Sequence, residues 1–94
     1  MRQEPLALSS EALQLLRMSV RINCHCSVLN SKLDGIRSLF VMRGQADIAV
    51  PGAIALLPLE QLKHSCETSV WQHALEEQEA KLCQVQQQLS SLLQ

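Results

Sequence analysis

The stretch WQHALEEQEAKLCQVQQQLSSLLQ, residues 71–94, decides the fold. Its apolar and near-apolar positions follow one another in alternating steps of four and three: Trp71, Leu75, Gln78, Leu82, Val85, Leu89 and Leu92. This heptad spacing keeps one stripe on one side of a helix, while the Glu, Gln and Lys residues between keep the other side polar. Because such a stripe is stable only when something apolar covers it, the sequence predicts a helix that has a helical neighbour.

The pattern extends upstream from residue 71. Pro58 suits the first turn of a helix and Glu60 follows directly behind it, so we predict one helix over 58–94. Its early apolar positions make a separate stripe: Leu59, Leu62, Cys66 and Val70. The shift between the two stripes resembles a stutter in the heptad.

The N-terminal half contains a second long series with helical spacing: Leu15, Met18, Ile22, Cys26, Leu29, Leu33, Ile36 and Phe40. Ser9 or Ser10 can cap this helix and Gly44 can end it, which predicts a helix over 9–43 behind a flexible leader, 1–8. Apolar and polar residues alternate within 18–28, which is typical of a strand. The length of the helical series favours a helix, and an α+β domain with an edge strand stays an alternative.

The connection, 44–57, contains Pro51-Gly52 and yet is unusually apolar, so we expect it to fold back on the helix ends. The predicted fold class is all-α. Residues 9–94 form a single domain, an antiparallel helical hairpin or coiled coil of two long helices that partner helices complete. Opposite net charges, +3 for 1–44 and −3 for 58–94, favour this pairing.

The hairpin predicts a register in which the numbers of facing residues add up to about 101, given the predicted helix ends. The facing pairs are then Leu39–Leu62, Gly35–Cys66, Leu29–Trp71, Cys26–Leu75, Met18–Leu82 and Leu15–Val85, with Arg21 near Glu79 and Arg43 near Glu60. In this register, Gly35 lets the two helices approach closely.

Composition argues against several classes of function. Only 2% of the residues are aromatic and there is no cluster of Lys and Arg, so neither a base-stacking site nor a nucleic-acid surface is expected. The apolar runs are too short for membrane insertion and the N-terminus lacks a signal pattern. The default expectation is an intracellular, cytoplasmic protein.

Cys24, His25 and Cys26 are the residues most suggestive of chemistry. On a helix, side chains two residues apart point in nearly opposite directions, so both cysteines cannot bind one zinc ion. A Cys/His metal-binding module is therefore an alternative, and packed free thiols are favoured. Neither a phosphate loop nor a nucleophile–base motif is present in the sequence, so we expect no enzyme activity and no cofactor.

Both predicted helices have more apolar surface than one hairpin can bury, which indicates a protein partner, either a second copy or a heteromeric helical subunit. The candidate partner-binding residues are Leu13, Val20, Cys24, Val28, Cys66, Val70, Trp71, Ala74 and Leu93. Trp71 is either a core residue or an anchor for the partner. The function predicted is a non-enzymatic interaction module, an adaptor or subunit of a larger helical assembly. The alternative is a small cytoplasmic chaperone for a helical subunit of the secretion-system type.

Overall fold

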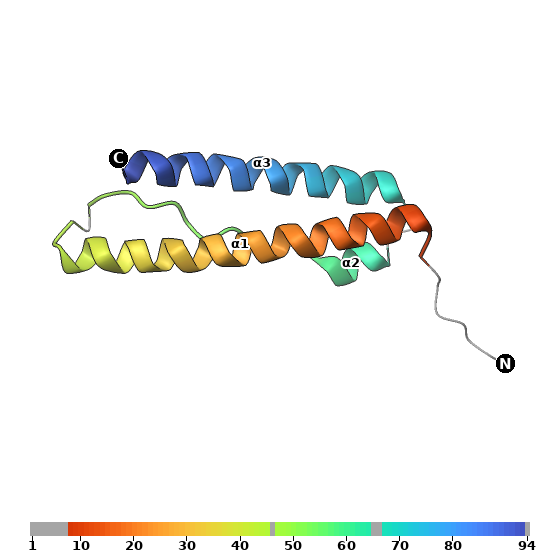
Figure 1. Ribbon diagram of the computed structural model, residues 1–94, viewed down its shortest axis with the longest axis horizontal. Coiled ribbons are helices and arrows are strands. Elements are labelled where there is room, and N and C mark those ends of the chain that lie inside the picture. Colours follow the sequence, from red (N-terminus) through yellow and green to blue (C-terminus); the bar gives the residue numbers. More distant parts are fainter. Residues whose placement is uncertain (1–7, 46, 65–66, 94) are drawn as a thin grey trace.

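Two long helices lie side by side and a short helix packs against the first of them (Figure 1). The computed structural model describes residues 8–45, 47–64 and 67–93. These contain α1 (Ser10–Met42), α2 (Leu59–Lys63) and α3 (Thr68–Leu92). Helices account for 76% of the described residues, and no strand occurs among them. The all-α fold with two long packed helices is therefore confirmed, and 18–28 is helical.

The ends of α1 follow local rules. The Ser9 hydroxyl accepts a hydrogen bond from the Ala12 N–H at 3.1 Å, which caps the first turn. At the other end, Gly44 has a φ of 74°, a conformation that favours glycine. Its N–H donates to the Val41 carbonyl at 3.1 Å and the Gln45 N–H donates to the Phe40 carbonyl at 2.8 Å, which together make a Schellman motif.

The direction of the helix pairing differs from the prediction. Trp71 of α3 bonds to Ser19 of α1, and Gln78 of α3 bonds to Cys26. The residue numbers rise together along both helices, so α1 and α3 run parallel, as their colours show in Figure 1. The antiparallel register is therefore wrong. Arg21 and Glu79 still line one cleft, because both registers place the middle of α1 beside the middle of α3.

The connection explains the parallel direction. Residues 49–57, here named the return segment, run in an extended form back along α1, so that α3 can start near the beginning of α1 (Figure 1). Nine extended residues cover roughly 30 Å. A tight turn would have forced antiparallel neighbours, whereas this segment carries the chain back over about half of α1.

Polar side chains of α1 hold the return segment at regular intervals. The Asn30 side chain accepts the Ile54 N–H at 2.8 Å and donates to the Ile54 carbonyl at 3.0 Å. The Asn23 side chain makes the same two bonds to Leu57, at 2.8 and 3.2 Å. Arg37 donates to the Pro51 carbonyl at 3.0 Å, which adds a third rung.

These hydrogen bonds can repeat because the spacing of the polar residues along α1 matches the spacing of their partners along the return segment. Seven residues of α-helix rise about 10.5 Å, and three extended residues span about 10 Å. A side-chain amide offers one donor and one acceptor, which is what one residue of an extended chain needs. The asparagine side chains thus make the backbone hydrogen bonds that a neighbouring strand would make with the return segment in a sheet.

The second half of the chain contains two helices where one was predicted over 58–94. The α2 helix ends at Lys63, and Glu67 has extended backbone angles before α3 starts. The break, between Lys63 and Thr68, falls within the predicted stripe of Leu59, Leu62, Cys66 and Val70 and not at the shift between the two stripes. Leu62 of α2 is buried in the core, whereas Val70 of α3 is 50% exposed.

The core is a row of apolar side chains between α1, α3 and the return segment. Its members are Ala12, Leu15, Ile22, Cys26, Leu29, Leu33, Ile54, Leu57, Leu62, Trp71, Leu75, Leu82 and Leu89. The predicted stripe of residues 71–92 is confirmed, with Val85 and Leu92 half-buried. On α1 one predicted position is wrong, because Met18 is 40% exposed while Ser19 is fully buried.

Candidate protein-interaction surfaces

A buried hydrogen-bond chain fixes the register of the two long helices. The Trp71 indole Nε1 donates to the Ser19 hydroxyl at 2.8 Å, and that hydroxyl donates to the Leu15 carbonyl at 2.7 Å. A small hydroxyl residue is needed here because an aliphatic side chain would leave the buried indole N–H without an acceptor. Trp71 is 1% exposed, so the interpretation as a core residue is confirmed and its ring is not offered to a partner.

Gln78 connects all three layers of the molecule. Its Nε2 donates to the Ala55 carbonyl of the return segment at 2.6 Å and lies 3.5 Å from the Cys26 sulfur of α1. Gln78 is buried at a position of the heptad stripe where an apolar residue is the usual choice. Its amide thereby ties the return segment to α3 through a partly buried hydrogen bond.

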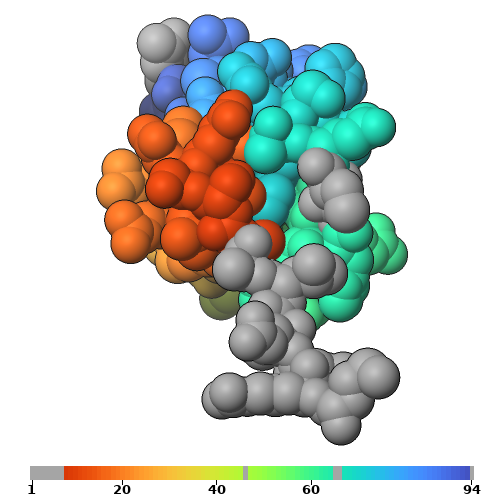
Figure 2. All heavy atoms as spheres, turned by 90° about the vertical axis from the view of Figure 1, so that its right-hand side faces the viewer, coloured from red at the N-terminus to blue at the C-terminus, as the bar shows by residue number. Residues whose placement is uncertain are grey.

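The side of α1 opposite the core is named here the outer face. In Figure 2, which looks along the helices, α1 has α3 and the chain of α2 on one side, and its other side is open. At about 100° per residue, the outer face consists of Ser10, Leu13, Arg17, Val20, Cys24, Ser27, Val28, Ser31, Gly35, Ser38, Leu39 and Met42. Its large apolar side chains are 42–84% exposed.

The outer face is unusual because it is almost uncharged. A surface helix normally presents charged and polar residues opposite its core stripe. The corresponding side of α3 does so, with Ser69, His73, Glu76, Glu77, Gln84, Gln87 and Ser91. On α1, Arg17 lies within the outer face, and Arg21 lies at its border, at the same angle around the helix as Leu39. The two long helices therefore differ in what they offer to a partner.

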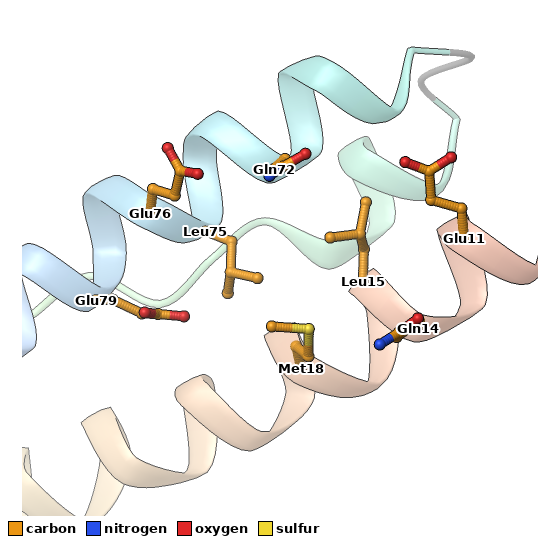
Figure 3. Close-up of a pocket in the computed structure, with 8 residues that line it drawn as sticks. All are labelled: Glu11, Gln14, Leu15, Met18, Gln72, Leu75, Glu76 and Glu79. Carbon is orange, nitrogen blue, oxygen red and sulfur yellow. The ribbon is translucent and has the colours of Figure 1, made fainter.

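A second surface feature is a cleft between the N-terminal halves of α1 and α3 (Figure 3). Leu15, Met18 and Leu75 converge at its floor. The remaining lining residues are Glu11, Gln14, Gln72, Glu76 and Glu79. This lining therefore combines an apolar floor with carboxylate and amide side chains.

The Cys and His residues do not converge among the described parts of the chain. Cys24 is exposed and Cys26 is buried, as expected for positions two apart on a helix. Within residues 8–45, 47–64 and 67–93, no group of three or more His, Cys, Asp or Glu side chains could hold a metal ion. Cys66 lies outside the described residues.

The predicted partner-binding residues separate into three groups. Leu13, Val20, Cys24 and Val28 share the outer face, and Val70 and Leu93 are exposed near the two ends of α3. Ala74 is half-buried and Trp71 is in the core, while Cys66 is outside the described ranges. The sequence interpretation missed the other members of the outer face, among them Gly35, Leu39 and Met42, which continue the spacing of its second stripe.

Comparison with known proteins adds no relative: no family model, no curated protein and no solved structure matches this chain. Over the described ranges, none of the helices has the length and apolar character that crossing a membrane requires.

Proposed function

We propose that this chain is a non-enzymatic interaction module, an adaptor or subunit of a larger helical assembly, which binds a protein partner through the outer face of α1. One observation carries the proposal: α1 has a buried stripe toward α3 and the return segment, and a second, exposed stripe of apolar and small residues on its opposite side. Contiguous exposed apolar surface of this kind marks interaction sites in proteins.

The packing within the chain supports the same conclusion. The apolar residues of the return segment, Ile54 and Leu57, are already used to cover α1 and α3 from one side. No described segment of the chain is left to cover the outer face, which runs along most of α1. A second molecule that covered this face would bury its Leu13, Val20, Val28, Leu39 and Met42 side chains.

Site-specific photo-crosslinking in the native cells tests the proposal. A benzoylphenylalanine replaces Val28 of the outer face in one variant and Gln87 of the polar side of α3 in the other; both residues are exposed. We expect a discrete protein adduct from position 28 that disappears when Val20→Glu is added, and none from position 87. Equal adducts from both positions, or none from position 28, would contradict the proposed function.

A further inference from the structure

We infer that the occupant of the outer face is an amphipathic helix of a different protein, with acidic side chains along one edge of its own apolar stripe. This inference rests on the proposed function and names the kind of partner. It stands on the shape of the outer face and on the placement of the unpaired basic residues at its edge.

The shape of the outer face suits a closely packed helix. Apart from Val28, its central part is made of small side chains: Cys24, Ser27, Ser31, Gly35 and Ser38. A Cβ at Gly35 would meet nothing within 4 Å, so none of the described residues explains a glycine, which disfavours helix relative to alanine. Small side chains let the axis of a second helix come near, and a straight stripe over several turns matches another helix.

The basic residues beside the outer face lie along the edge that faces α3. Arg17 lies within the outer face, and Arg21 and Lys32 follow along the edge toward α3; none of the three forms an ion pair with a described residue. On the other edge, Asp34 already pairs with Arg37 at 2.9 Å. A partner helix therefore meets a basic row along one edge, and carboxylates are the complementary groups.

The same charges argue against a second copy of this chain. If two α1 helices met antiparallel through their outer faces, the basic rows of both copies would share one edge. If they met parallel, Arg17 of each copy would lie against Arg17 of the other. Like charges in such positions oppose association. The acidic residues of α3 do not supply an alternative, because the outward side of that helix lacks an apolar stripe.

Two synthetic peptides test this inference with the full chain. Both are amphipathic helices with the same Leu and Ala stripe; the row beside the stripe is Glu in one peptide and Lys in the other. Fluorescence anisotropy at low salt measures their binding to the wild type, to Val28→Glu, to the double variant Arg17→Glu with Lys32→Glu, and to the control Ala80→Glu on the polar side of α3. Circular dichroism verifies that each variant is folded.

We expect the acidic peptide to bind wild type about tenfold more tightly than the basic one, because several exposed ion pairs add up to such a ratio. The double variant should reverse this preference, Val28→Glu should abolish binding of both peptides, and Ala80→Glu should leave it unchanged. Equal binding of both peptides, or no binding of either, overturns the inference. Light scattering that shows a dimer lost in Val28→Glu would also overturn it, while the proposed function of the outer face would stand.

Discussion

At the scale of single residues, the molecule depends on a few polar side chains in apolar surroundings. Ser19, Asn23, Asn30 and Gln78 each sit where an aliphatic residue would bury as well, and each satisfies a donor or acceptor that packing would leave unpaired. Their positions decide which surfaces meet, because apolar stripes alone tolerate sliding and reversal.

Ser19→Ala is expected to lower the free energy of unfolding by about 1–3 kcal/mol, because it leaves the buried Trp71 indole N–H without an acceptor. Chemical denaturation measures the change. Ser27→Ala, on the exposed side of the same helix, is the matched control and should stay within about 0.5 kcal/mol. Equal effects of the two changes would show that the Ser19–Trp71 bond does not contribute.

Asn30→Asp tests the asparagine rungs. The change keeps the shape of the side chain but replaces the amide donor with a carboxylate oxygen facing the Ile54 carbonyl. We expect a loss of about 1–3 kcal/mol in unfolding free energy, together with faster amide hydrogen exchange at Ile54. Ser31→Asp adds the same charge to the exposed neighbouring position and should do neither. Unchanged exchange at Ile54 in Asn30→Asp would contradict the rung.

At the scale of elements, Gly35 within α1 and Gly44 just after the end of α1 have opposite effects on stability. Gly44→Ala should destabilise the chain by about 1–2 kcal/mol, because its positive φ strains any residue with a Cβ. Gly35→Ala should instead stabilise the isolated chain by about 0.5–1 kcal/mol, because the position is helical and open. Thermal unfolding of both variants measures this. Destabilisation by Gly35→Ala would mean that a neighbour packs on this glycine in the isolated chain.

The elements themselves were largely readable from the sequence. Apolar spacing and caps gave α1 to within one residue at each end, and the stripe of residues 71–92 gave the buried side of α3. The apolar connection predicts a segment that folds back, but its extended course along α1 was missed although its signal was present. Asn23, Asn30 and Arg37 recur every seven residues, and Pro51, Ile54 and Leu57 every three. Matching these two periods requires knowing that an extended chain lies along a helix.

At the scale of the whole molecule, pattern and charge left the direction of the helix pair undetermined. Opposite net charges on the two halves favour contact in either direction, and heptad stripes fit parallel and antiparallel neighbours alike. The connection between α1 and α3 decides the direction of the pair. Because 49–57 is extended and held along α1, the chain returns before α3 begins.

The parallel direction is tested most directly by one distance. Gln14 and Gln72 line the same cleft, and Ser91 lies about 28 Å further along α3 at about 1.5 Å per residue. Spin labels are placed at Gln14→Cys and Ser91→Cys, with the native cysteines replaced and unlabelled protein in excess. Double electron–electron resonance should then give a distance of about 30 Å. An antiparallel pair would bring the two labels within about 20 Å, and that result would contradict the fold described for this chain.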